Sequence, residues 1–318
     1  GLTFFFYQKQ YALSVPEEEK ENGPEREKNG PARKKIDDCV GETAVRTFER
    51  ERGKQLPEVH LIRSLIHYVE LLRPSELGMV LNHFSRQEKG GRGKTSHWSP
   101  EQKDAVADLW ATVIHKLPTL LVDCDQSSLA IIVNSFACAL KLPVEAFDEI
   151  VAPLVIKHAP LLASRYLIMI MNAFAKINYY RPHLMGALCN RIDGENELQF
   201  NQQDIANGLN ALARLQHQHA PAANIMAKAL LKTDIKQMTQ LHLSQYFNAL
   251  DRLRLVIPEA VEACENELQQ RCIMKNEPVR GEFLGALARA LMNLHRPRTA
   301  VYDKREAFKY VMEFSIPR

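Results

Sequence analysis

The sequence predicts an all-α protein, an α-solenoid of about six helix-turn-helix repeats with a 38-residue period. The main observation is a short phrase that recurs at a fixed interval, starting at Asn134, Asn172, Asn210 and Asn248 and reading Asn-Ala-Leu-Ala or a close variant. Further copies start at Asn82 and, in divergent form, at Arg289. A strict period of this length in helix-forming sequence is typical of stacked helical pairs.

The first helix of each repeat carries apolar residues five positions before the phrase and two positions after its start. These positions are seven apart and fall on one helical face, so we expect them to be buried. The earlier column comprises Leu77, Leu129, Leu167, Ile205, Leu243 and Leu284, and the later column comprises Phe84, Phe136, Phe174, Leu212, Leu250 and Leu291.

Small residues and prolines complete the pattern. A small residue follows the first position of the phrase, except at His83, and would let neighbouring helices approach closely: Ser135, Ala173, Ala211, Ala249 and Ala290. Prolines follow eight to eleven residues after the phrase starts, at 143, 182, 221, 258 and 297. Proline is tolerated in the first turn of a helix, so these positions predict where the second helix of each pair begins.

Two regions depart from the repeat. Residues 1–56 are predicted to be a charged, extended N-terminal segment, and residues 57–318 the helical-repeat array. Residues 1–16 contain no acidic residue and one lysine, which would suit the end of an organellar presequence or the start of a mature chain. Between Asn82 and Asn134 the interval is 52 residues, so an insertion loop is predicted at 88–99.

Composition and spacing argue against several classes of protein. No apolar run reaches the ~18–20 residues that a membrane-spanning helix needs. The six cysteines are scattered, which favours reduced, mostly structural thiols in an intracellular compartment over disulfides or a zinc site. Gly93-Lys94-Thr95 lacks the glycine that a phosphate-binding loop has five positions earlier, where Glu88 stands. We therefore expect no metal, no cofactor, no small-molecule substrate and no enzymatic activity.

Two further columns point to a binding surface. The asparagines that open the phrase are followed four residues later by a cation in most repeats, and both positions lie nearly opposite the apolar stripe. Stacked repeats would align amides that can pair with base edges and cations that can meet RNA phosphates. The alternative is that the asparagines hold the repeats together and the cations favour the helix macrodipole. The residues are Asn82, Arg86, Asn134, Asn172, Lys176, Asn210, Arg214, Asn248 and Arg252.

The insertion loop offers a second candidate RNA contact. Its basic residues could meet phosphates and its tryptophan could stack on a base: Lys89, Arg92, Lys94 and Trp98. The alternative is a tolerated surface loop. Between residues 57 and 288 the 23 basic and 24 acidic side chains nearly cancel, while residues 289–318 carry 7 basic and 3 acidic ones. Any contact with RNA is therefore expected to be local.

The repeat phrases resemble those of a known family. The period and the segments Ile205 to Leu215 and Leu167 to Ile177 resemble the octotricopeptide repeat, and also the related heptatricopeptide and FAST-kinase-like repeats of organellar proteins, several of which end in an RAP domain. The resemblance covers about residues 57 to 316. The tryptophan common in such repeats is absent from the signature helices. We also expect no RAP-like domain after the last repeat.

That resemblance implies an organellar protein of RNA processing, RNA stability or the ribosome. We expect a non-catalytic RNA-associated protein of the mitochondrial matrix, with the plastid as the alternative compartment. The expected role is a structural subunit of a mitochondrial ribosome or related ribonucleoprotein, whose partners are RNA, in particular ribosomal RNA, and neighbouring proteins. The alternative is a protein-only scaffold subunit of a mitochondrial complex.

Overall fold

The computed structural model describes residues 44–50, 57–89, 98–194 and 198–271, together with 283, 285, 287, 290, 293 and 294. Within these residues the secondary structure is helical and contains no strand, which confirms the predicted all-α class. Among the described helices, none is long and apolar enough to cross a membrane.

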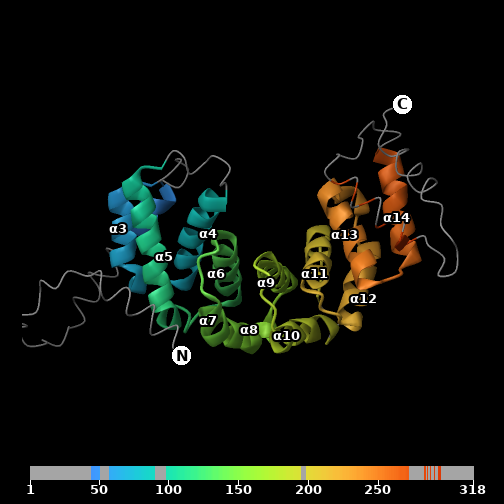
Figure 1. The fold of residues 1–318 in the computed structure, drawn as a ribbon, viewed down its shortest axis with the longest axis horizontal. Helices are drawn as coiled ribbons and strands as arrows, with labels where there is room; N and C mark the ends of the chain where they lie inside the picture. Colours follow the sequence, from blue (N-terminus) through green and yellow to red (C-terminus); the bar gives the residue numbers. More distant parts are fainter. Residues whose placement is uncertain are drawn as a thin grey trace, which may run out of the picture.

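Five helices form an inner row in which each packs against the next. They lie along the inner side of an arc (Figure 1). In chain order they are α4 (Pro74–Lys89), α6 (Gln126–Ala139), α9 (Ser164–Lys176), α11 (Gln202–Leu215) and α13 (Gln240–Leu253).

A second row lies on the outer side of the arc (Figure 1). Its helices alternate with those of the inner row along the chain: α5 (Pro100–Leu120), α7 (Val144–Ala146) continuing through the π-helical turn η3 (Phe147–Val151) into α8 (Ala152–His158), α10 (Pro182–Asp193), α12 (Ala220–Ala229) and α14 (Pro258–Gln269). Short 3-10 turns connect the rows at η1 (Val69–Leu71), η4 (Ala159–Leu161), η5 (Leu230–Lys232) and η6 (Ile235–Gln237). At the N-terminal end, α3 (Val59–His67) packs on α5.

Proline marks the start of the outer helices, as predicted. Pro182 and Pro258 are the first residues of α10 and α14, Pro221 is the second residue of α12, and Pro143 caps α7. Pro297 lies outside the described residues.

The predicted apolar columns form the core between the rows. Every described member is at most 1% exposed: Leu77, Leu129, Leu167, Ile205, Leu243, Phe84, Phe136, Phe174, Leu212 and Leu250. The small residues Ser135, Ala173, Ala211, Ala249 and Ala290 are fully buried as well. Burial of an apolar side chain of this size contributes roughly 1.5–3 kcal/mol, so these columns provide much of the stability of the fold.

Four inner helices end in the same way. The residue six positions after the asparagine has a left-handed backbone with φ of 54° to 56°, at Leu140, Asn178, Gln216 and Arg254. The next backbone N–H then bonds to the carbonyl five residues earlier, for example Tyr179 to Phe174 at 2.9 Å. This is the Schellman geometry, which satisfies carbonyls at a helix end. These four residues are 38 positions apart along the chain.

Side-chain caps fix the other end of several inner helices. Asp125 accepts hydrogen bonds from the backbone N–H groups of Ser127 and Ser128 at 2.8 and 2.9 Å before α6. Asn201 and Asp204 form a reciprocal capping box before α11. Such caps satisfy N–H groups that have no partner in the first turn.

The predicted N-terminal boundary at residue 57 is wrong in one part. Residues 44–50 form a helix whose apolar side joins the core. Phe48 is fully buried, and its ring lies 5.2 Å from that of His83 and 5.9 Å from that of Phe84. Ala44, Val45 and Phe48 share one helical face, so this segment can bury its apolar side chains despite the charges around it. Residues 1–43 and 51–56 lie outside the described residues.

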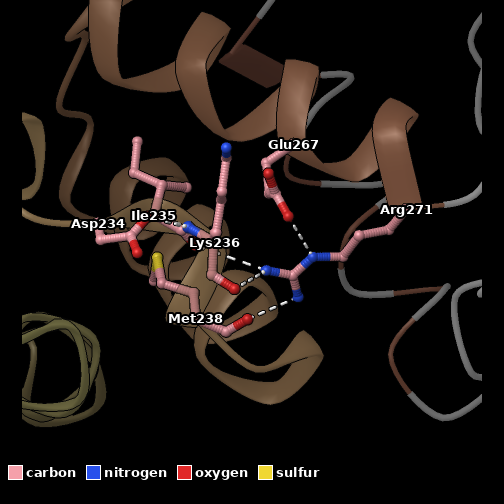
Figure 2. Close-up of polar contacts among 6 residues, drawn as sticks. All are labelled: Asp234, Ile235, Lys236, Met238, Glu267 and Arg271. Carbon is pink, nitrogen blue, oxygen red and sulfur yellow. Dashed lines mark hydrogen bonds and ion pairs between the residues drawn. The ribbon is translucent and has the colours of Figure 1, made fainter. Parts of the chain in front are cut away.

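Two arginine contacts tie neighbouring elements together. The buried Arg271 donates to Glu267 at 2.6 Å and to the carbonyls of Met238 and Lys236 at 2.6 and 2.8 Å (Figure 2). It thereby holds the turn that leads into α13. Near the middle of the arc, Arg181 donates from Nε and a terminal nitrogen to both carboxylate oxygens of Asp148 at 2.7 and 2.6 Å.

Candidate nucleic-acid interface

The predicted asparagines and cations occupy equivalent places on the inner row. Each asparagine is half-buried, so the amides are more enclosed than the sequence predicts: Asn82, Asn134, Asn172, Asn210 and Asn248. Four residues later, Arg86, Arg214 and Arg252 are exposed and Lys176 is half-buried.

Two more positions complete the surface, and the sequence prediction missed them. On every inner helix the residues seven and three positions before the asparagine also remain unburied. Spacings of four, three and four keep all four positions on one side of a helix, so helical spacing alone could have found them. We call this set the inner face: Ser75, Met79, Asn82 and Arg86 on α4; Ser127, Ile131, Asn134 and Cys138 on α6; Arg165, Met169, Asn172 and Lys176 on α9; Gln203, Asn207, Asn210 and Arg214 on α11; Leu241, Gln245, Asn248 and Arg252 on α13.

The inner face carries cations and no acidic residue. Its five cations are Arg86, Arg165, Lys176, Arg214 and Arg252. The basic and acidic residues of the array nearly cancel overall, so this is a local concentration of one sign of charge. Such a surface attracts an anionic partner.

One pair of predicted residues contacts each other between neighbouring helices. Lys176 on α9 donates from Nζ to Asn134 Oδ1 on α6 at 2.8 Å, and it lies 3.5 Å from Cys138 Sγ. At the last repeat, Asn293 donates from Nδ2 to Asp251 Oδ1 at 2.9 Å. In both places the side chain four residues after the start of the phrase reaches back to the preceding repeat. At these two positions the packing alternative describes what the side chains do.

The arginines of α11 and α13 differ from Lys176. Within the described part of the chain, neither Arg214 nor Arg252 forms an ion pair or a side-chain hydrogen bond. The amides of Asn207 and Asn210 likewise make no side-chain hydrogen bond to a described residue. These groups are therefore available to a partner.

The inner face changes character along the array. Three residues before the asparagine, α4, α6 and α9 carry Met79, Ile131 and Met169, whereas α11 and α13 carry Asn207 and Gln245. The N-terminal part of the face is therefore partly apolar, while the C-terminal part carries three amides on α11 (Gln203, Asn207 and Asn210) and two on α13 (Gln245 and Asn248).

The insertion loop does not supply the predicted aromatic contact. Trp98 is only 8% exposed and belongs to the hydrophobic core, directly before Ser99, the N-cap of α5. Burying its large apolar ring is more favourable than leaving it in water, so Trp98 does not stack on a base here. Helix α4 also extends to Lys89, so the predicted start of the loop at residue 88 is wrong. The side chain of Lys89, and Arg92 and Lys94, lie outside the described residues.

The cysteines of the described region have structural surroundings for the most part. Cys124, Cys189 and Cys264 are buried free thiols, and burial raises the pKa of each to about 12. Such thiols stay protonated and inert at neutral pH. Cys138 on the inner face is half-buried, and Cys39 and Cys272 lie outside the described residues.

No family model and no curated protein sequence matches the chain. The resemblance to the octotricopeptide family is therefore still a prediction.

Proposed function

We propose that this protein binds single-stranded RNA along its inner face, as a non-catalytic RNA-associated subunit of an organellar ribonucleoprotein. The observation that carries the proposal is the charge of that face, which has five cations and no acidic residue. Phosphate contacts by lysine and arginine provide most of the sequence-independent affinity for nucleic acid. A row of such side chains on successive helices is suited to following an extended RNA backbone.

The proposed architecture is an α-solenoid of about six repeats with a 38-residue period. Its support is the recurrence of the left-handed residues Leu140, Asn178, Gln216 and Arg254 at that interval, and the alternation of inner and outer helices. In such arrays each repeat contacts its neighbours, and the stack presents an extended surface for binding.

The cellular setting rests on the family resemblance. The proposed compartment is the mitochondrial matrix, with the plastid as the alternative, and the proposed assembly is the ribosome or a related ribonucleoprotein.

Salt-dependent binding tests the RNA proposal. The full chain is titrated into fluorescently labelled single-stranded RNA at several salt concentrations, and the variant replaces Arg86, Arg214 and Arg252 with glutamine. Each lost phosphate contact makes the slope of log affinity against log salt shallower by about 0.7, so the variant's slope should be shallower by about 2. We also expect affinity to fall by about tenfold or more.

A matched control removes the same charge from the outer row. Lys157, Lys228 and Lys232 are exposed on or beside α8 and α12, and replacing them with glutamine should leave the affinity and the slope nearly unchanged. Equal losses in both variants would mean that net charge, rather than the inner face, determines binding. Absence of RNA binding by the unmodified chain would reject the proposal.

A protein-only scaffold is the second candidate, and the Lys176 contact favours it. Because Lys176 bonds to Asn134, part of the column already serves to join repeats. Crosslinking in isolated mitochondria, with the crosslinked peptides identified by mass spectrometry, separates the two candidates. RNA attached to peptides containing Arg214 or Arg252 supports RNA binding, whereas protein crosslinks alone, with RNA recovered elsewhere in the sample, support the scaffold.

A further inference from the structure

Hydrogen-bonding capacity on the inner face is concentrated on α11 and α13. Asn207 and Asn210 lie three residues apart on α11, and Gln245 and Asn248 occupy the equivalent positions on α13. All four residues are half-buried, so part of each remains accessible. Two such amides on each of two adjacent helices form a block with both donors and acceptors.

Part of this capacity is unused inside the protein. Gln245 Oε1 is enclosed and has no hydrogen-bond partner among the described residues. The side chains of Asn207 and Asn210 make no hydrogen bond to any described residue. An enclosed acceptor without a partner is unfavourable by roughly 1–3 kcal/mol. Rotation of the Gln245 side chain would bring this oxygen to the surface, where a ligand that donates a hydrogen bond relieves that cost.

The N-terminal helices lack this block. At the position of Asn207 and Gln245 they carry Met79, Ile131 and Met169, which offer apolar contact and no strong donor or acceptor. The amide oxygen of Asn134 on α6 already accepts a hydrogen bond from Lys176 on α9. On α4 and α9 the amides of Asn82 and Asn172 make no side-chain hydrogen bond to a described residue. Each of these helices therefore offers one amide to a base edge, whereas α11 and α13 each carry at least two.

We propose that sequence discrimination by this protein is strongest at α11 and α13, which together contact the base edges of about two adjacent nucleotides. Arg214 and Arg252, one turn farther along the same helices, hold the neighbouring phosphates. Packed helices lie about 8–10 Å apart, so a short stretch of extended single strand reaches both α11 and α13. The inference rests on the proposed RNA binding and adds where on the inner face the bases are read.

The test selects bound sequences from a random pool of single-stranded RNA 12-mers, with the full chain, and then measures affinities for the most and least enriched sequences. We expect enrichment of a short element of about two nucleotides. A base edge read by a well-placed amide gives about five- to a hundredfold discrimination per base.

The decisive variant is Asn207→Met with Gln245→Met, which gives α11 and α13 the residue that α4 and α9 carry at this position. The ratio of best to worst affinity should fall towards one, while the affinity for the worst sequence stays within about twofold. The matched control, Met79→Ala with Met169→Ala, should leave the ratio unchanged. Helical circular dichroism and a thermal midpoint verify that each variant is folded.

The outcomes separate this inference from the proposed function. RNA binding without sequence preference, or a preference that survives Asn207→Met with Gln245→Met, overturns the inference and leaves the proposed function intact. A preference lost in the control variant instead would move discrimination to the N-terminal helices and also overturn it. Absence of RNA binding by the unmodified chain rejects both.

Discussion

The two sides of the inner-row helices differ in how they vary from repeat to repeat. On the buried side, leucine, phenylalanine and alanine return at the same positions in nearly every repeat, and the described members are almost fully buried. On the inner face, the positions of Met79 and Gln203 carry different residues from helix to helix. Packing fixes the first pattern because each helix must fit the same neighbours. Apart from the recurring asparagine and the cation that follows it, the inner face is not under that constraint, so the residues at these two variable positions can follow a partner.

The largest effect is expected from breaking the buried side. Phe174 is fully buried between Phe147 and Tyr179, with ring centroids 6.1 and 5.3 Å away. Phe174→Ala should lower the free energy of unfolding by about 3–5 kcal/mol because it removes apolar contacts and leaves a cavity. Urea denaturation measures the loss. Phe174→Leu should lose clearly less, and equal losses would contradict the packing account.

A smaller effect is expected where two helices approach closely. At Gly208 an added Cβ would lie 2.7 Å from Ile168 Cδ1 and 2.8 Å from Met226 Sδ, whereas at Gly186 it would meet nothing within 4 Å. Gly186→Ala should stabilise α10 by about 1 kcal/mol, because alanine is the better helix former. Gly208→Ala should be less favourable than this by about 1–2 kcal/mol, since Ile168 and Met226 must move. Matching thermal midpoints for the two variants would show that the contact at Gly208 is loose.

A comparable effect, with a pH signature, is expected at the start of α6. Hydrogen bonds from the Ser128 backbone, and further ones from Ser127 and Ser128, lower the pKa of Asp125 from its ordinary value to about 2. Because the folded-state pKa is the lower one, the ionised cap stabilises the fold above about pH 4, and this contribution is lost as pH falls towards 2.

Two substitutions separate the cap from its charge. Asp125→Ala should cost about 1 kcal/mol at neutral pH. Asp125→Asn keeps an accepting oxygen and should retain most of the stability without the loss between pH 4 and 2. Urea denaturation across this pH range checks both, and an unchanged pH dependence in Asp125→Asn would assign the loss to another group.

The smallest effect on stability is expected on the inner face. Replacing Arg214 and Arg252 with glutamine should change the free energy of unfolding by less than about 0.5 kcal/mol, because both side chains are exposed and neither is paired with a described residue. A loss of 2 kcal/mol or more in urea denaturation would make these arginines part of the framework and remove the contrast between the two sides.

The framework could be predicted from sequence because repetition amplifies weak signals. A single leucine at residue 167 says little, but the same position filled six times with an aliphatic residue predicts a buried column. The helix at 44–50 was missed because it occurs once, with Phe48 in a strongly charged stretch. The burial of Trp98 was missed for the same reason, since no other repeat has a residue to compare with it.

The candidate site was predicted only in part. The asparagine and cation columns were visible as repeats, whereas the residues at the columns of Met79 and Gln203 differ between repeats, so only their helical spacing from the asparagine could have located them. The bond from Lys176 to Asn134 joins residues 42 positions apart. It depends on how α6 and α9 sit against each other, which sequence spacing within one helix does not determine.

The left-handed residues at the ends of the inner helices have a consequence for insertions and deletions. An α-helix turns by about 100° per residue, so one residue added inside α9 would rotate Asn172 and Lys176 away from their neighbours' row. The same residue added after Asn178 would leave the helix in register. The first repeat is consistent with this. Glu88, six residues after Asn82, is still helical, so α4 does not end at the position where the other inner helices do. The interval from Asn82 to Asn134 is 52 residues instead of 38, and the additional residues follow the helix. Insertions and deletions should therefore be tolerated in the connections between helices, whereas insertions and deletions inside an inner helix should disrupt the inner face.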